Sequence, residues 1–220
     1  MAENQIQILE GGEIPNELSF PDFVNVEGVI VNPFEFIFLD EDGSKLLQRI
    51  YEKCPDYRGN LFLKFIFRIL EFTQHKFFNH FIQVILIEND PLKVETIYKF
   101  LISDIKVLAY DDSSTCVVQK LIENVNEKHI EEIAEKLEAN SNFEKFIGGE
   151  NAKNINHIFQ ALIKRQKKEK NDEICEEISQ NFILYAKDKY GCFIIEALLE
   201  NCSEKSYKMF LEKTLENIKE

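Results

Sequence analysis

Apolar and polar positions recur five times along the chain in one pattern, with a glutamine or glutamate at the same place in each copy. The two residues before this anchor are apolar in every copy, and so are the second and third residues after it, counting Tyr51 as apolar. The copies are Gly43–Tyr51 (GSKLLQRIY), Phe78–Leu86 (FNHFIQVIL), Ser114–Ile122 (STCVVQKLI), Ile155–Ile163 (INHIFQALI) and Gly191–Leu199 (GCFIIEALL). The anchors lie 35, 36, 41 and 36 residues apart. A period of this size is typical of a solenoid of repeated supersecondary units.

Each copy is predicted to be a helix with two distinct sides. At about 100° per residue, the four apolar positions gather on one side, while the anchor and the residues three and four before it gather on another. We call these three residues a triplet. The triplets are Ser44/Lys45/Gln48, Asn79/His80/Gln83, Thr115/Cys116/Gln119, Asn156/His157/Gln160 and Cys192/Phe193/Glu196. Stacking the five helices would align the triplets along one continuous surface.

The triplets resemble those of the Pumilio (PUF) family of single-stranded RNA readers, whose repeats carry motifs of the form G-S-R-x-x-Q, N-H-x-x-Q and C-R-x-x-Q. The resemblance covers roughly residues 34–202 and depends on five copies in register. It implies an all-α fold, an α-solenoid of about five PUF-like repeats. Residues 1–33 would then be an N-terminal leader, and residues 203–220 a C-terminal capping helix.

The chemistry of the triplet suits the recognition of a nucleobase. A Gln or Asn amide offers a donor and an acceptor together, so it can pair with the edge of a splayed-out base, while a flat or cationic side chain between the two edge readers can stack on the base. The resemblance implies uracil for Asn/Gln, adenine for Ser/Gln and Thr/Gln, and guanine for Cys/Glu. Because the family binds RNA antiparallel to the protein, the expected core site is 5′-GUAUA-3′.

The resemblance therefore predicts a sequence-specific single-stranded RNA-binding protein that reads one base per repeat in a messenger RNA 3′ region or ribosomal RNA and acts in post-transcriptional regulation. The net charge of −13 favours an alternative, because phosphate contacts normally supply much of the affinity for RNA. In that alternative the solenoid is a scaffold that docks on a ribosomal or other ribonucleoprotein particle and contacts ribosomal or regulatory proteins. A basic triplet surface would favour RNA, and an acidic one protein partners.

Composition excludes several other classes. Five cysteines without a Cys-x-x-Cys pair indicate a reducing compartment and no disulfide or zinc framework. There is no secretion signal and no uncharged apolar run long enough to span a bilayer, so we expect a cytoplasmic protein, or a nucleolar or ribosome-associated one. No membrane or DNA partner is expected.

No catalytic motif stands out. The chain lacks a phosphate-binding glycine loop, a His-Glu-x-x-His pair and a Gly-x-Ser-x-Gly elbow, and its four histidines do not cluster. Cys116 and Cys192 are interpreted as small, half-buried helix residues rather than nucleophiles. We therefore expect no enzyme, no cofactor and no metal site.

Several segments outside the triplets carry their own predictions. Leu61–Phe72 is expected to be one apolar helix in which Phe62, Phe65, Phe67 and Ile69 pack between layers. The extra length of the fourth unit is placed in a loop over Asn140–Ala152. Phe23–Val31 alternates as in an extended arm, which either caps the first repeat or docks a partner. The basic run Lys164–Lys170 either contacts phosphate or is a solvated loop.

Overall fold

The fold is known from a computed structural model that describes residues 24–26, 29–31, 40–137 and 152–218. Almost all of these residues are helical. The helices are α3 (Glu41–Lys53), α4 (Arg58–Phe65), α5 (Ile69–Gln74), α6 (Asn79–Ile87), α7 (Pro91–Leu101), α8 (Ile105–Tyr110), α9 (Thr115–Asn124), α10 (Glu127–Lys136), α11 (Ala152–Arg165), α12 (Lys168–Gln180), α13 (Phe182–Lys187), α14 (Gly191–Asn201) and α15 (Glu204–Ile218). Two short 3-10 turns, η1 (Pro55–Tyr57) and η2 (Ile66–Arg68), flank α4.

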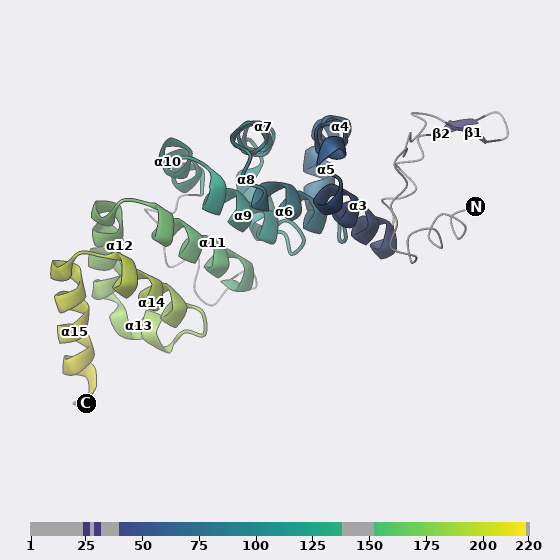
Figure 1. Cartoon of the computed structure of the whole chain (residues 1–220). Coiled ribbons are helices and arrows are strands. Elements are labelled where there is room, and N and C mark those ends of the chain that lie inside the picture. The colour runs from purple at the N-terminus through teal and green to yellow at the C-terminus, as the bar shows by residue number, and fades with distance from the viewer. Residues whose placement is uncertain (1–23, 27–28, 32–39, 138–151, 219–220) are drawn as a thin grey trace.

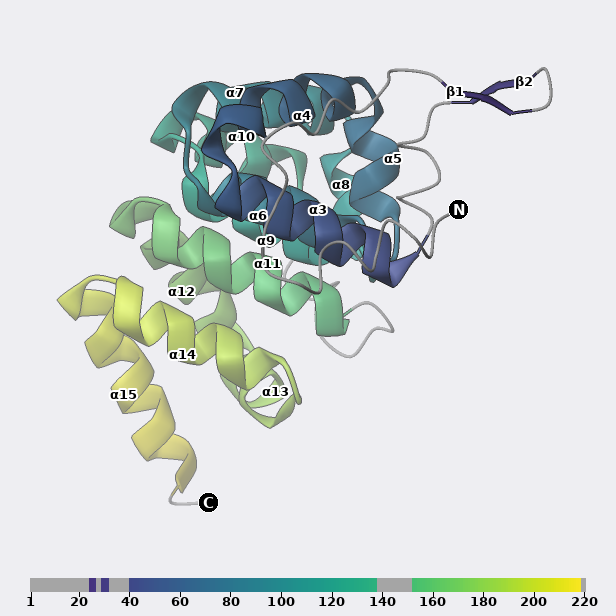
Figure 2. The same cartoon turned by 45° about the vertical axis from the view of Figure 1, so that its right-hand side comes forward.

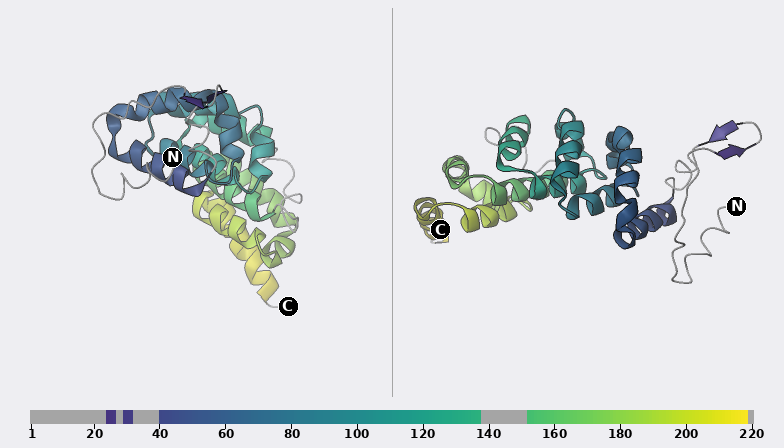
Figure 3. Two further views of the ribbon diagram at one scale, coloured as in Figure 1. Left: turned by 90° about the vertical axis from the view of Figure 1, so that its right-hand side faces the viewer. Right: turned by 45° about the horizontal axis from the view of Figure 1, so that its top comes forward.

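The five predicted anchor helices are α3, α6, α9, α11 and α14, and we call them the inner helices. They pack in chain order, α3 on α6, α6 on α9, α9 on α11 and α11 on α14 (Figures 1 and 2). The helices α4, α7, α10, α12 and α15 lie outside this row, and the short helices α5, α8 and α13 connect the two (Figure 1). Figure 3 shows the same succession of units from α3 to α15. The predicted α-solenoid is confirmed.

The apolar stripes hold the row together as predicted. The residue before each anchor, typified by Leu47, Ile82 and Phe159, is at most 8% exposed in all five inner helices. Burying a side chain of this kind contributes about 1.5–3 kcal/mol. One contiguous core therefore runs through all the units, as expected where each repeat can bury its apolar face only against its neighbours.

Aspartates before the helices fix where several of them begin. Asp40 accepts a hydrogen bond of 2.7 Å from the backbone N–H of Gly43 at the start of α3. Asp90 accepts from the N–H groups of Leu92 and Lys93 in α7, which begins with a proline. Such caps satisfy N–H groups that have no partner inside the helix.

Leu61–Phe72 is not one helix, and this prediction was wrong. The 3-10 turn Ile66–Arg68 divides it into α4 and α5, and it changes the angular step between side chains. Phe62, Phe65 and Ile69 are buried as predicted, whereas Phe67 is 82% exposed, because it follows Phe62 by five residues and so lies about 140° round a helix from it. The Phe67 ring contacts that of Phe100 in α7 edge to face, with centroids 6.3 Å apart. Phe67 therefore lies at the surface.

The segments at the two ends are described only in part. Within 1–39, β1 (Val24–Val26) and β2 (Val29–Val31) form an antiparallel ribbon, which agrees with the extended segment predicted there. The remaining leader and residues 140–151 of the predicted loop lie outside the described residues. Beyond the fifth inner helix, α15 packs on α12 and α14, and buries Phe210. The helix predicted over Ser203–Ile218 is thus present.

Candidate nucleic-acid interface

The structure brings the five triplets onto neighbouring inner helices, but their three positions differ in exposure. The second members Lys45, His80, Cys116, His157 and Phe193 are all exposed. The third members Gln48, Gln83, Gln119 and Gln160 are half-buried, and Glu196 is exposed. The first members Ser44, Asn79, Thr115 and Asn156 are 2–5% exposed, whereas Cys192 is exposed. In the first four triplets the displayed part is therefore narrower than the sequence predicted, because it consists mainly of the second and third members.

The first members are buried because they make hydrogen bonds inside the solenoid. The Ser44 hydroxyl donates to the Phe77 carbonyl, 2.7 Å away, in the turn before the next inner helix. The Asn79 amide donates to the carbonyls of His75 and Lys76. The Thr115 hydroxyl donates to the Ala109 carbonyl. A backbone carbonyl can only accept, so these contacts fix the direction of each hydrogen bond and leave an oxygen of the first member facing its anchor.

That oxygen orients the anchor in three of the repeats. The Gln48 Nε2 donates to the Ser44 hydroxyl at 3.2 Å, and Gln83 makes the same contact with Asn79 at 3.1 Å. Gln160 Nε2 donates to Asn156 at 2.9 Å. One N–H and the carbonyl oxygen Oε1 of each anchor are not used by any described residue. Each anchor therefore retains one donor and one acceptor side by side, which is what the edge of a base requires.

The fifth triplet is open because its helix lies at the end of the described row. The counterparts of Cys192 in the other four inner helices are covered where the next unit packs, and no inner helix follows α14 in the part of the chain that the structure describes. Cys192 is consequently exposed, and so is Cys116 on α9, so the half-buried placement predicted for both thiols was wrong. Phe193 exposes 45% of its surface beside Cys192.

The balance of charge differs from one helix to the next, with two acidic and no basic residues on α14 and two basic and no acidic residues on α4. A lysine stands seven residues before the anchor in three copies, and these exposed lysines are Lys76, Lys153 and Lys189. α11 carries three basic residues and no acidic one, and α6 carries neither. Acidic residues outnumber basic ones on the outer helices α10 and α12. Part of the negative charge thus lies away from the triplets.

Ion pairs modify two of the predicted charged features. Lys45 pairs with Glu41 at 2.7 Å, and this contact raises the pKa of Lys45 and lowers that of Glu41. The basic run is not a free loop, since its residues end α11 and begin α12. Within the run, Lys167 pairs with Glu131, and the Arg165 guanidinium donates to the Val125 carbonyl. These contacts tie the run to the preceding unit.

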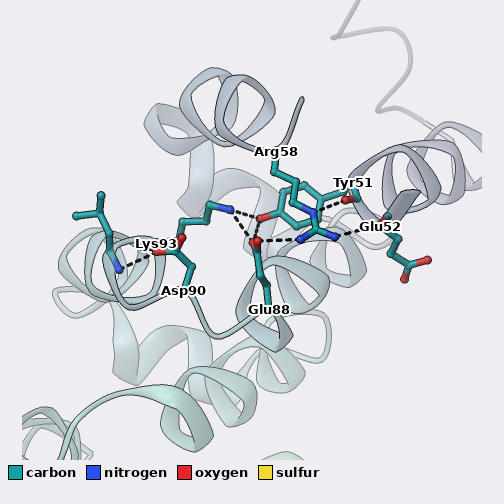
Figure 4. A network of polar contacts seen from close by, with 7 residues as sticks. Tyr51, Glu52, Arg58, Glu88, Asp90 and Lys93 are labelled. Atoms are coloured by element: carbon teal, nitrogen blue, oxygen red, sulfur yellow. Dashed lines mark hydrogen bonds and ion pairs between the residues drawn. The ribbon is translucent and has the colours of Figure 1, made fainter. Parts of the chain in front are cut away.

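A polar cluster that the sequence did not reveal joins the first three units (Figure 4). The Tyr51 hydroxyl donates to Glu88, which also accepts from Lys93 at 2.6 Å and from Arg58 at 3.1 Å. The Arg58 Nε donates to the Tyr51 carbonyl. Burial raises the pKa of Glu88, but the hydrogen bonds from Lys93 and Tyr51 outweigh it and the net pKa is lowered. The cluster holds a carboxylate in its charged form.

Neither a metal centre nor a membrane-spanning segment is found in the described ranges. No group of three or more His, Cys, Asp or Glu side chains there is placed to hold a metal ion. No helix in the same ranges is long and apolar enough to cross a membrane.

Comparison with known proteins relates two segments of the chain to a family of repeats. The model of the Pumilio-family RNA binding repeat matches residues 105–138 and 181–215, which contain the third and fifth triplets. No curated protein matches the chain significantly. The chain contains Pumilio-family repeats, and the resemblance predicted from the triplets is confirmed.

Solved structures with this architecture share the fold at low sequence identity. The Puf3 RNA binding domain bound to Cox17 RNA 3′ UTR recognition sequence site A is 20% identical with a TM-score of 0.76, covering 96% of this chain and 57% of that one. PUF-8 in complex with PBE-RNA is 18% identical with a TM-score of 0.71, covering 85% and 54%. The RNA-binding domain of yeast Puf5p bound to MFA2 RNA is 19% identical with a TM-score of 0.65, covering 83% and 51%. This chain spans about half the length of these domains.

Proposed function

We propose that this protein binds single-stranded RNA selectively, with one base per repeat, and acts in post-transcriptional regulation in the cytoplasm. The observation that carries the proposal is the donor and acceptor pair left on the anchors of α3, α6 and α11, each beside an exposed second member. The Puf3, PUF-8 and Puf5p domains of the same fold are described in complex with RNA, which supports the same ligand class here.

Within each repeat the three triplet positions take different roles in this proposal. The anchor pairs with the base edge, and the second member stacks on the base face, a contact worth about 1–3 kcal/mol per base. The buried first member acts through the anchor, because its oxygen sets which way the amide points. The sequence 5′-GUAUA-3′ is the site that the triplets specify, with the first repeat on the 3′ adenine.

The charge distribution is compatible with a polyanionic ligand despite the net charge of −13. Lys76, Lys153 and Lys189 stand seven residues before three of the anchors and are exposed, Lys153 as the second residue of α11 and the other two in the turns before α6 and α14. Each lysine that neutralises a phosphate releases counterions and makes binding depend on salt. The basic run between α11 and α12 contributes less, because Lys167 and Arg165 are already engaged with the preceding unit.

A second candidate is a scaffold that docks on a ribosomal or other ribonucleoprotein particle, with a nucleolar or ribosome-associated location. The specific observation in its favour is the Ser44 contact with Phe77, in which a triplet residue joins two repeats instead of facing a ligand. The acidic outer surfaces of α10 and α12 would suit basic ribosomal proteins.

Titration of the protein with fluorescent GUAUA-containing RNA tests the proposal. A scrambled RNA of the same composition and a DNA oligonucleotide of the same sequence are the controls, each at a low and a moderate salt concentration. We expect tighter binding to GUAUA than to either control, with affinity that falls as salt rises. Equal and negligible binding to all three would exclude RNA reading and leave the scaffold function.

A further inference from the structure

The third repeat holds its anchor differently from the first, second and fourth. Gln119 Nε2 donates to Glu123 Oε1 at 3.2 Å, one helical turn further along α9, and not to the first member Thr115. The donor cannot be misassigned, because a carboxylate oxygen only accepts. The Thr115 hydroxyl donates to the Ala109 carbonyl, so its oxygen would be able to accept from an anchor just as Ser44 does. The anchor Gln119 therefore contacts Glu123 instead of Thr115, the first member of its triplet.

Glu123 is placed to keep Gln119 in that position. It stands four residues after the anchor on the same side of α9, and 37% of its side chain is exposed. The Lys120 ammonium binds the other carboxylate oxygen of Glu123 and holds the side chain towards this part of the helix. The residue at the same place in the first repeat is also a glutamate, Glu52, yet Gln48 contacts Ser44 there. A glutamate four residues after the anchor is thus not sufficient to hold the anchor away from the first member of its triplet. Of these two repeats, only the third shows that arrangement.

We propose that Glu123 determines the base specificity of the third repeat by positioning Gln119 and by adding a carboxylate beside the base edge. This inference rests on the proposed RNA-binding function. Each carboxylate oxygen of Glu123 has two lone pairs, so each can accept a further hydrogen bond besides the one from Gln119 or Lys120. An exocyclic amino group, as in adenine or cytosine, donates to such an acceptor. The O4 carbonyl of uracil is repelled by it, and the third repeat therefore rejects uracil.

The test compares RNA with adenine or uracil at the central position of GUAUA. We expect the wild-type protein to bind GUAUA more tightly than GUUUA by roughly tenfold, the effect of one to two hydrogen bonds. Glu123→Ala should reduce this ratio to about two or below, and Glu123→Gln, which keeps the shape but removes the charge, should give an intermediate ratio. Glu52→Ala is the matched control and should leave the ratio unchanged.

A measurement on the free protein tests the positioning of Gln119 by Glu123 separately from RNA binding. In the nitrogen-correlated spectrum, the side-chain amide signal of Gln119 should shift in Glu123→Ala and stay in place in Glu52→Ala. An unmoved Gln119 signal, or RNA binding with an unchanged ratio in Glu123→Ala, overturns the role of Glu123 and leaves the proposed function standing. Absence of any RNA binding by the wild-type protein overturns the proposed function together with the base discrimination inferred here.

Discussion

The Ser44 hydroxyl donates a hydrogen bond of 2.7 Å to the backbone carbonyl of Phe77, 33 residues further along the chain. The same oxygen accepts from Gln48, so one side chain both joins the first two repeats and orients an anchor. Stability and recognition are therefore coupled at this position. A residue that the sequence assigned to base reading also holds the solenoid together.

Ser44→Ala should lower the free energy of unfolding by about 1–2 kcal/mol, because it leaves a buried carbonyl without its donor. Cys192→Ala is the matched control, since the exposed thiol at the equivalent place in the fifth repeat joins no two units. Its expected effect is within about 0.5 kcal/mol. Urea titration followed by circular dichroism measures both, and equal losses in the two variants would contradict the structural role of Ser44.

Two glycines give opposite predictions for the same substitution. A Cβ on Gly191 at the start of α14 would lie 2.4 Å from the Tyr185 carbonyl, so Gly191→Ala must displace backbone and should cost about 1–3 kcal/mol. Gly59 in α4 has no atom within 4 Å of the corresponding point. Gly59→Ala should raise stability by about 0.5 kcal/mol, since it restricts the unfolded chain. Thermal melting of the two variants should shift the midpoint in opposite directions.

The carboxylate at the centre of the polar cluster makes stability depend on acid pH. Because the folded pKa of Glu88 is lowered, its contribution is fully present above the unfolded value of about 4.5 and is lost as pH falls through the folded pKa. Glu88→Gln removes this dependence and should destabilise the protein by about 1–3 kcal/mol at neutral pH, because Lys93 and Arg58 lose a charged acceptor. Urea midpoints between pH 3 and pH 7 should show a smaller slope for the variant. An unchanged slope would place the acid sensitivity elsewhere.

Most of the fold could be predicted from the periodicity of the apolar residues, because their spacing decides which side of each helix is buried. The inner helices follow from such spacing. The 3-10 turn Ile66–Arg68 was not predicted, since no residue pattern marks it. Phe67 was assigned to the core wrongly, because a residue five positions after Phe62 faces another side of a helix. The cluster around Glu88 was also missed, because its members come from three units and meet only after the solenoid has stacked.

The candidate site was predictable in its positions but not in its exposure. Spacing identified Asn79 and Asn156 as neighbours of their anchors, and both are in contact with them. That these residues are buried depends on how closely successive inner helices approach, which a single helix pattern does not contain. Glu123 lies outside the triplet, and it differs from Glu52 in accepting a hydrogen bond from the anchor amide of its own repeat, Gln119.

The second members of the triplets should contribute unequally to the free energy of RNA binding. His157 and Cys116 occupy the same exposed position in the fourth and third repeats, but only the imidazole has a flat face for a base. We expect His157→Ala to weaken binding to GUAUA by about 1–3 kcal/mol and Cys116→Ala to change it by less than about 0.5 kcal/mol. Fluorescence anisotropy at one salt concentration measures both. Equal effects of the two substitutions would argue against stacking at this position.

The fourth repeat offers the sharpest test of base reading, because its anchor geometry is regular. Asn156→Ser with Gln160→Glu replaces the amide donor by a carboxylate, which can only accept. A carboxylate suits the two neighbouring donors of guanine and repels the carbonyl groups of uracil, so the preferred site should change from GUAUA to GGAUA. The same pair of changes in the second repeat, Asn79→Ser with Gln83→Glu, should move the preference at the fourth base and leave the second base as uracil. Competition between the RNAs measures both switches. A double variant that folds and binds RNA but keeps uracil at the second base would show that the fourth triplet does not select it.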